Sequence, residues 1–226
     1  MTGKPLLLGH RGCRGRSVTV LPVENSLAAF EYALTNGCDG FEFDVRHTRD
    51  GRNVLWHDPK WHGMEIAATN YTDLADGNGI RLPLLEDALQ RFGSRAFLDI
   101  ELKIYGSEHS VVAAVKMHPP QNGFILSSFY PEILANLHEL DPSLLLGFIC
   151  DSDRAMAVWR EMTVSVFLPQ DAYVQPSLID EVHTRGQQIM TWTVNDVRRM
   201  RQLAEWGIDG IISDDPQLMH QTFQSD

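Results

Sequence analysis

The sequence predicts a single closed (β/α)8 barrel spanning all 226 residues. Short apolar runs typical of strands alternate with helical segments from one end to the other. Polar residues gather where the strand runs end, as they do at the catalytic face of such barrels. No GxGxxG motif follows any run, which counts against an open nucleotide-binding sheet.

The expected strands are short and rich in Leu, Ile, Val and Phe. A hairpin arm, Val54–His57, follows the second strand. The eight barrel strands are Leu6–Gly9, Phe41–Val45, Ala96–Leu102, Gly123–Ser127, Leu144–Ile149, Val164–Leu168, Gln188–Val194 and Gly210–Ser213.

The expected helices lie between these strands, and glycines at 37, 93, 186 and 207 close four of them. An eighth begins at Pro216, where proline suits a first helical turn. The other seven are Ser26–Asn36, Leu84–Phe92, Glu108–Met117, Pro131–Leu140, Arg154–Arg160, Ser177–Arg185 and Asp196–Trp206.

The second strand alternates apolar and acidic residues, which places Glu42 and Asp44 on the face opposite its aromatic side chains. The pair Asp50-Gly51 suits the centre of a type I′ hairpin turn. With that turn, residue pairs across the hairpin sum to 101, so His57 should lie directly across from Asp44.

The third strand repeats this alternation and directs Asp99, Glu101 and Lys103 to the barrel axis. Neighbouring strands lie about 4.8 Å apart, which brings Glu101 close to Glu42 and Asp44. Three such carboxylates repel by about 3 kcal/mol per pair at an effective dielectric constant near 20. A hard divalent cation, Mg²⁺ or Ca²⁺ before Zn²⁺, would remove this cost.

His10 and His57 are then better interpreted as a general acid and base than as metal ligands. Arg11 and Lys103 are suited to hold phosphate oxygens. A metal, two histidines and two cations together indicate phosphodiester cleavage. The sequence favours His10 as the base because His57 lies on the outer hairpin. It leaves open whether water or a substrate hydroxyl, through a cyclic phosphate, attacks phosphorus.

Each of these residues also has a purely structural interpretation. Glu42 and Asp44 could form ion pairs inside a barrel, and Lys103 could pair with Glu101 or Asp99. Phe129 and Trp192 are expected to line the mouth against the substrate, although packing is an alternative. The simplest role for Asp214 is at a strand end or helix cap.

The formal net charge of −11 argues against binding to nucleic acid or to an anionic membrane. The first apolar run is too short for a signal peptide or a membrane span. Three cysteines without CxxC spacing suggest neither disulfides nor a zinc site. We therefore expect a cytoplasmic monomer or homodimer that acts on a small molecule.

The motifs that carry this chemistry occur in one order along nearly the whole chain. They are His10-Arg11-Gly12, Glu24-Asn25-Ser26, Glu42-Phe43-Asp44-Val45, Thr48-Arg49-Asp50-Gly51, His57-Asp58-Pro59, Glu101-Leu102-Lys103, Thr191-Trp192-Thr193-Val194-Asn195 and Gly210-Ile211-Ile212-Ser213-Asp214. In this arrangement the chain resembles the glycerophosphodiester phosphodiesterase family.

The resemblance implies a (β/α)8 barrel that hydrolyses glycerophosphodiesters to glycerol 3-phosphate and an alcohol with a divalent metal, Mn²⁺ included. It matches Glu42, Asp44 and Glu101 to metal ligands and His10 and His57 to the acid–base pair. It also matches Arg11 and Lys103 to phosphate contacts.

The chain departs from the family pattern in two loops beside the expected site. The insertion over residues 58–82 is a shortened form of the family's cap. The loop Cys13–Val23, with Arg14 and Arg16, is longer than usual. A changed cap admits an alternative, a phospholipase D-like or lyase-type enzyme acting on lysophospholipids. A catalytically silent barrel that binds phosphodiesters is a further alternative.

Overall fold

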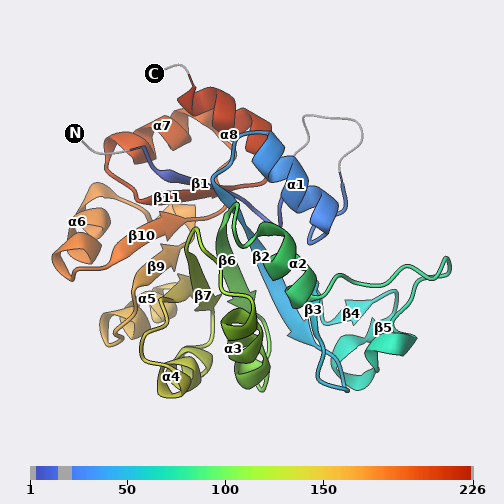
Figure 1. The fold of residues 1–226 in the computed structure, drawn as a ribbon. Helices are drawn as coiled ribbons and strands as arrows, with labels where there is room; N and C mark the ends of the chain where they lie inside the picture. Colours follow the sequence, from blue (N-terminus) through green and yellow to red (C-terminus); the bar gives the residue numbers. More distant parts are fainter. Residues whose placement is uncertain (1–3, 15–21, 225–226) are drawn as a thin grey trace.

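The structure, a computed structural model, describes residues 4–14 and 22–224. Eight parallel strands close into a barrel because β1 pairs with both β11 and β2 (Figure 1). Going round the barrel, the order is β1, β2, β6, β7, β8, β9, β10 and β11. Their bounds are β1 (Leu6–Gly9), β2 (Gly40–His47), β6 (Phe97–Leu102), β7 (Phe124–Ser128), β8 (Leu146–Cys150), β9 (Val166–Pro169), β10 (Gln188–Thr191) and β11 (Gly210–Ser213).

A helix follows each of these strands before the next one, and together the helices form the outer layer. The predicted (β/α)8 fold is thus confirmed, and the predicted elements differ from the observed ones mainly at their ends. The helices are α1 (Leu27–Thr35), α2 (Leu85–Phe92), α3 (Glu108–Met117), α4 (Pro131–Leu140), α5 (Asp153–Arg160), α6 (Pro176–Thr184), α7 (Val197–Glu205) and α8 (Pro216–Phe223).

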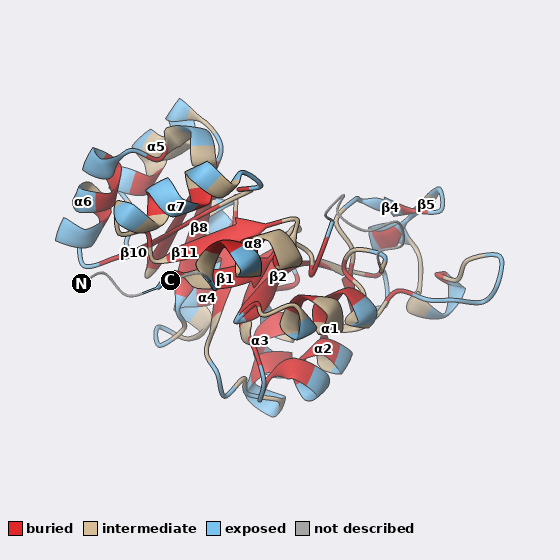
Figure 2. Ribbon diagram, turned by 90° about the horizontal axis from the view of Figure 1, so that it is seen from above, coloured by how far each residue is buried: buried red, intermediate tan, exposed pale blue. Residues whose placement is uncertain are grey.

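The apolar core has two parts, one between strands and helices and one inside the barrel. In the outer part Phe30 of α1 stacks on Phe41 of β2, with ring centroids 4.2 Å apart, and packs against Phe92 of α2. The inner part is small and includes Leu8, Ile125, Val166, Met190 and Ile212. Figure 2 shows the buried residues concentrated in the strands and on the inward faces of the helices, whose outward faces are exposed.

The hairpin after β2 forms, but the predicted register is wrong. In β2 and β3 (Asn53–Leu55) the numbers of paired residues sum to 100. The Thr48 N–H donates to the Arg52 carbonyl beyond the last strand pair, so the loop is the three residues 49–51 rather than two. Only Gly51 of the loop has a positive φ, and the Asp50 carboxylate accepts hydrogen bonds from Thr48 and from the Tyr71 backbone. Trp56 therefore takes the place across from Asp44, and its N–H donates to the Asp44 carbonyl.

Residues 58–82 form an insertion beside the end of β2 (Figure 1). It contains the two-stranded sheet of β4 (Lys60–Trp61) and β5 (Met64–Glu65), followed by two 3₁₀ helices, η1 (Ile66–Ala68) and η2 (Tyr71–Asp73). A separate small apolar cluster holds it together, formed by Val54, Trp61, Ile66, Leu74 and Leu82. That the insertion acts as a shortened cap stays a prediction.

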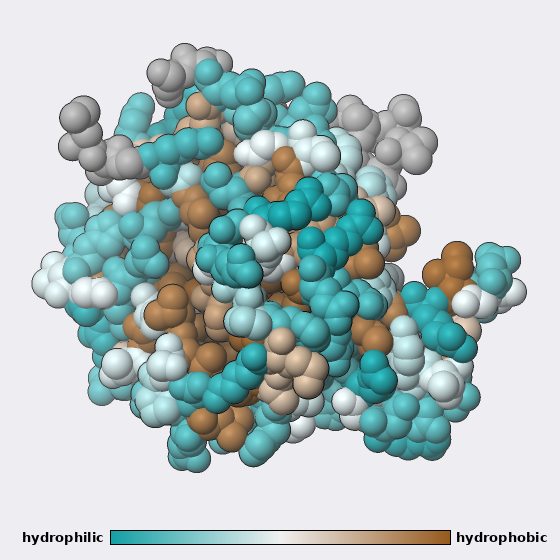
Figure 3. Space-filling model, viewed as in Figure 1, coloured by the Kyte–Doolittle hydropathy of each residue, from teal (hydrophilic) through white to brown (hydrophobic). Residues whose placement is uncertain are grey.

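The surface is mainly hydrophilic on the face seen in Figure 3, with apolar side chains visible between polar ones. Within the described parts of the chain, none of the helices has both the length and the apolar character needed to span a bilayer.

We expect Phe30→Ala to lower the free energy of unfolding by about 3–5 kcal/mol, because it leaves a cavity between α1, α2 and β2. Urea denaturation followed by circular dichroism measures this change. The exposed Thr35→Ala on the same helix is the control and should change stability by less than about 0.5 kcal/mol. A loss below about 1 kcal/mol for Phe30→Ala would show that β2 does not depend on this packing.

Candidate active site

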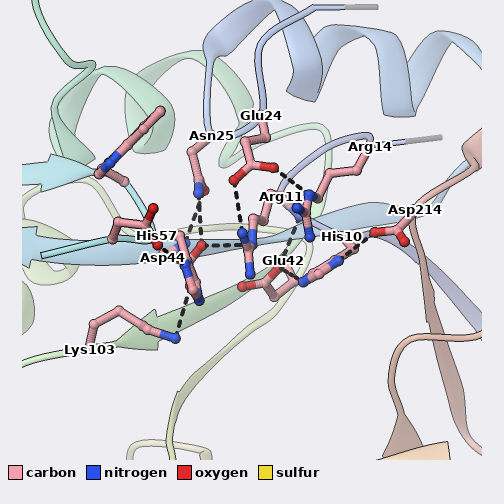
Figure 4. A network of polar contacts seen from close by, with 12 residues as sticks. His10, Arg11, Arg14, Glu24, Asn25, Glu42, Asp44, His57, Lys103 and Asp214 are labelled. Atoms are coloured by element: carbon pink, nitrogen blue, oxygen red, sulfur yellow. Dashed lines mark hydrogen bonds and ion pairs between the residues drawn. The ribbon is translucent and has the colours of Figure 1, made fainter. Parts of the chain in front are cut away.

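A cavity of about 70 Å³ opens at the carboxyl ends of the barrel strands. It gathers eight of the nine residues predicted for the site, and the ninth, Asp44, is buried beside them. Figure 4 shows most of these polar side chains converging from β1, β2, β6 and the hairpin. The lining residues are His10, Arg11, Glu42, His57, Asp99, Glu101, Lys103, Phe129, Ile149, Leu168, Trp192 and Ile212.

The three predicted metal ligands do converge. Asp44 of β2 lies directly across from Glu101 of β6, and Glu42 lies one layer below. One carboxylate oxygen from each of the three residues lies within 4.8 Å of the others. All three side chains are buried, and Asp44 is fully inaccessible to solvent.

Glu42 and Asp44 each have one carboxylate oxygen hydrogen-bonded within the protein, and all three residues have one buried oxygen that is not hydrogen-bonded. Glu42 Oε2 accepts from the backbone N–H of Arg11 at 2.9 Å, and Asp44 Oδ2 accepts from Asn25 Nδ2 at 2.8 Å. The other oxygen of Glu42 is buried without a hydrogen-bond partner, while those of Asp44 and Glu101 have only ion-pair contacts with Lys103. A hard divalent cation prefers such an all-oxygen donor set, so the residues present fit one.

Two cationic side chains partly neutralise the negative charge of the three carboxylates. Lys103 Nζ lies 2.6 Å from Glu101 Oε1 and 3.4 Å from Asp44 Oδ1, and Arg11 Nε lies 3.1 Å from Asp44 Oδ2. Arg11 also donates to Glu24 Oε1 at 2.8 Å. Of the two ion pairs considered as an alternative role for Lys103, the one with Glu101 is present. The Lys103 amine also contacts Asp44.

Burial and mutual repulsion shift the pKa values of this group. Burial, followed by the charges of Asp44 and Glu101, raises the pKa of Glu42 well above its usual range. Burial and Asp44 likewise raise the pKa of Glu101 to about 8, although Lys103 opposes the shift. For Asp44, burial also opposes ionisation, but Lys103, Arg11 and Asn25 together hold its pKa below the usual range. Additional positive charge, beyond that of Lys103 and Arg11, would therefore stabilise the ionised carboxylates of this cluster.

The two histidines are each anchored through Nδ1 to an aspartate. His10 Nδ1 lies 2.7 Å from Asp214 Oδ1, and His57 Nδ1 lies 2.7 Å from Asp58 Oδ1. A carboxylate only accepts hydrogen bonds, so Nδ1 carries the proton and Nε2 is left for a reacting group. His10 Nε2 lies 3.9 Å from Glu42 Oε2.

His57 lines the cavity although it lies beyond the end of β3, outside the paired residues of the hairpin. The Arg46 guanidinium holds its backbone, with Nε donating to the His57 carbonyl at 2.8 Å. Burial lowers the pKa of the His57 imidazole, and the nearby Asp44 carboxylate opposes that shift. The charge of Asp44 thus acts on His57 although the strand pairing predicted to place them opposite each other is wrong.

The turn after β1 positions His10 and Arg11. Gly12 has a φ of +80°, and a Cβ at this position would lie 2.6 Å from the backbone of Ala29 in α1. Asn25, which lies just before α1, has a side chain that donates to Asp44 and accepts from the Asp44 N–H. Close packing of this turn on α1 therefore brings the Arg11 N–H to Glu42.

The opposite side of the cavity is apolar. Phe129 and Trp192 meet edge to face with ring centroids 5.6 Å apart, and the Trp192 indole N–H donates to the Leu168 carbonyl. Lys103 Nζ lies 5.4 Å from the centre of the Phe129 ring. The cavity thus has a charged wall from β1, β2 and β6 and an apolar wall from the later strands.

Comparisons with known proteins agree with this arrangement. The sequence pattern of the Glycerophosphoryl diester phosphodiesterase family matches residues 10–218. The chain belongs to this family. A glycerophosphodiester phosphodiesterase of Caldanaerobacter subterraneus is 28% identical over 96% of both chains. The uncharacterized protein YqiK of Bacillus subtilis is 31% identical over 93% of this chain and 95% of its own length.

Solved structures share the fold at lower identity. An Oleispira antarctica phosphodiesterase in complex with the product sn-glycerol-3-phosphate superposes with a TM-score of 0.83 at 23% identity, covering 97% of each chain. A glycerophosphodiester phosphodiesterase from Parabacteroides distasonis gives a TM-score of 0.84 at 23% identity, covering 98% of each chain.

Three residues support the site in ways that the sequence analysis does not predict. Asp214, expected at a strand end or helix cap, holds His10, and the helix cap of α8 is instead Asp215, which accepts from the Leu218 N–H. Asn25 and Glu24 hold Asp44 and Arg11. Their presence in the motifs Glu24-Asn25-Ser26 and Ser213-Asp214 was the available signal. Of the two loop arginines, Arg14 pairs with Glu24, and Arg16 lies outside the described residues.

We expect the free protein to lose stability as the pH rises from about 4 to 7, because burial raises the pKa of Asp99 to about 7. A carboxyl group with a raised pKa binds more protons in the folded state, so its contribution falls by up to about 1.4 kcal/mol per pH unit in this window. Urea denaturation in EDTA at several pH values measures the slope. Asp99→Asn should give a shallower slope, and an unchanged slope would contradict the shifted pKa.

Proposed function

We propose that the protein hydrolyses glycerophosphodiesters to glycerol 3-phosphate and an alcohol, using a divalent cation and two histidines. The observation that carries the proposal is the convergence of His10 and His57, each with Nδ1 anchored to an aspartate, on a cavity beside three buried carboxylates. The names of the relatives and the product bound to the Oleispira antarctica enzyme support this substrate class.

Glu42, Asp44 and Glu101 are the residues that would hold the cation, Mg²⁺ or Ca²⁺ by the chemistry of the donors, with Mn²⁺ as a substitute. When bound, the ion supplies positive charge that stabilises negative charge developing on the phosphoryl oxygens. Its positive charge also favours the ionised forms of Glu42 and Glu101, whose pKa values are raised without it.

Arg11 and Lys103 bind the phosphate in this proposal. Both line the cavity, and both already contact carboxylates that hold their charged ends in place. A phosphate that enters beside them gains charge-assisted hydrogen bonds without ordering a mobile side chain. Phe129 and Trp192 exclude water from the opposite side and provide an apolar wall for the carbon atoms of the substrate.

The two histidines transfer protons at opposite sides of the phosphate. One Nε2 takes the proton of the attacking oxygen, which belongs to water or to the glycerol 2-hydroxyl, and the other Nε2 protonates the departing alcohol. Burial lowers the pKa of His57, which keeps this ring neutral and able to accept a proton near pH 7. This favours His57 as the base, whereas the outer position of its hairpin favours His10.

Glycerol 3-phosphate release tests the activity directly. We expect turnover of glycerophosphocholine, glycerophosphoethanolamine and glycerophosphoglycerol with Mg²⁺, Ca²⁺ or Mn²⁺, and loss of turnover in EDTA. The proposed substrate class would be overturned if metal-loaded protein hydrolysed none of these diesters. It would also be overturned if the protein hydrolysed a lysophospholipid instead of them. A cyclic phosphate seen by phosphorus NMR would identify the glycerol hydroxyl as the attacking group.

We expect Glu42→Gln to weaken binding of Mn²⁺ or Ca²⁺ by at least about tenfold, the loss found when residues that merely orient a ligand are removed. Isothermal titration calorimetry measures the affinity without relying on turnover. Glu205→Gln, at an exposed position of α7, is the matched control and should bind as the wild type does. Equal affinities for both variants would remove Glu42 from the proposed ligands.

His10→Ala and His57→Ala should each lower kcat by about 10²–10⁴-fold while metal affinity is retained. Asp214→Asn should cost more activity than Asp58→Asn, because the Asp214 side chain is 24% exposed and that of Asp58 is 67% exposed. Steady-state kinetics with calorimetric metal titration separates these effects. Near wild-type rates in both histidine variants would exclude the acid–base pair.

The pH dependence of kcat/KM assigns the base. A base must be deprotonated, so the rate should fall on the acidic side of its pKa, which for His57 is lowered below 6.5 by burial. We expect the residual activity of His57→Ala to lack this acidic limb and that of His10→Ala to keep it. The reverse pattern would make His10 the base.

A further inference from the structure

A second hollow adjoins the cavity on the side of α4 and α5. This groove has a volume of about 570 Å³, against about 70 Å³ for the cavity. Glu101, Lys103, Phe129 and Ile149 line both, so the two spaces meet at these residues. The part of a phosphodiester that does not fit beside the histidines therefore has the groove next to it, on the other side of Lys103 and Phe129.

The outer part of the groove combines aromatic and acidic side chains. Tyr130 and Glu132, at the start of α4, and Asp151, which follows β8, line it. Tyr105 packs against Tyr130 with ring centroids 5.0 Å apart, and its hydroxyl donates to Glu132 Oε2 at 3.2 Å. Both tyrosines are more than 40% exposed, so neither is a core residue. Exposed aromatic rings beside a carboxylate are the groups that bind organic ammonium ions.

The residues that line only the groove carry a net negative charge. Glu132 and Asp151 are carboxylates, and Arg154 is the one cation among them. Lys103, which binds the phosphate in the proposed function, lies at the boundary with the cavity, where Glu101 also lines both spaces. A negative groove next to the phosphate site complements a zwitterion whose phosphate precedes an ammonium group.

We propose that this groove binds the leaving alcohol and selects alcohols with an ammonium group, such as choline or ethanolamine. The inference rests on the proposed function and names the substrate class within it. Tyr130 supplies a ring face to the cation, Glu132 supplies the neutralising charge, and Tyr105 holds the Glu132 carboxylate beside Tyr130. Within the described part of the chain, no hydrogen bond or ion pair joins these three side chains to the proposed metal ligands, so they set specificity without taking part in proton transfer.

The test compares kcat/KM for glycerophosphocholine and for glycerophosphoglycerol, whose leaving alcohol is neutral. We expect the wild type to prefer glycerophosphocholine. Tyr130→Leu and Glu132→Gln should each reduce this preference by about three- to tenfold, the range of an exposed to a partly desolvated cation–π contact. Hydrolysis of glycerophosphoglycerol should fall less than that of glycerophosphocholine in both variants, because its alcohol carries no charge.

Glu139→Gln is the matched control, since it removes a carboxylate from an exposed position further along α4. It should keep the wild-type preference, and thermal melting shows whether all three variants are folded. Choline chloride should inhibit the wild type competitively more strongly than sodium chloride at equal ionic strength, and this difference should be lost in Glu132→Gln.

The outcomes separate this inference from the proposed function. Hydrolysis of both diesters without preference, or a preference that survives Tyr130→Leu and Glu132→Gln, would overturn the ammonium site and leave the phosphodiesterase intact. A preference for an anionic alcohol that is lost in Arg154→Gln would also overturn the ammonium site. It would show that the groove selects negatively charged alcohols. Hydrolysis of no diester by metal-loaded protein would remove both proposals.

Discussion

The crowding of Glu42, Asp44 and Glu101 inside the barrel is the constraint on which the rest of the site depends. Burial of three carboxylates is tolerated only where cations and hydrogen-bond donors surround them. Arg11, Lys103 and Asn25 meet part of this need, and each comes from a different segment. The turn after β1, the residues just before α1 and the end of β6 are thus held together by their contacts with the buried carboxylates.

The fold tolerates three buried carboxylates because its two apolar cores are separate. The side of β2 that carries Phe41 and Phe43 packs on α1 and α2, while its other side carries the acidic residues. Inside the barrel the apolar cluster is small and leaves room for polar chemistry above it. Strand alternation therefore places a stabilising apolar face and a destabilising acidic face on opposite sides of the same strand.

The site divides into parts with separate tasks in the proposed reaction. The carboxylates and cations fix the phosphate, the two histidine–aspartate pairs present Nε2 atoms for proton transfer, and the apolar wall excludes water. The groove beside α4 and α5 shares Glu101 and Lys103 with the cavity, but Tyr130, Glu132 and Asp151, which also line it, lie outside the motifs shared with the family. Chemistry and choice of alcohol are thereby assigned to different loops, as expected for a barrel in which a rigid scaffold carries variable loops.

The sequence by itself determined the barrel, the faces of β2 and β6 and the convergence of the three carboxylates, because strand alternation and neighbouring positions follow from local spacing. It did not determine the hairpin register, since the Asp50 side chain bonds to Thr48 and to the distant Tyr71 in a loop that is one residue longer than predicted. It also missed Asp214 as the partner of His10, a contact 204 residues apart along the chain. The meeting of Tyr105, Tyr130 and Glu132 was decided only by the tertiary structure, because loops that follow different strands come together only when the barrel closes.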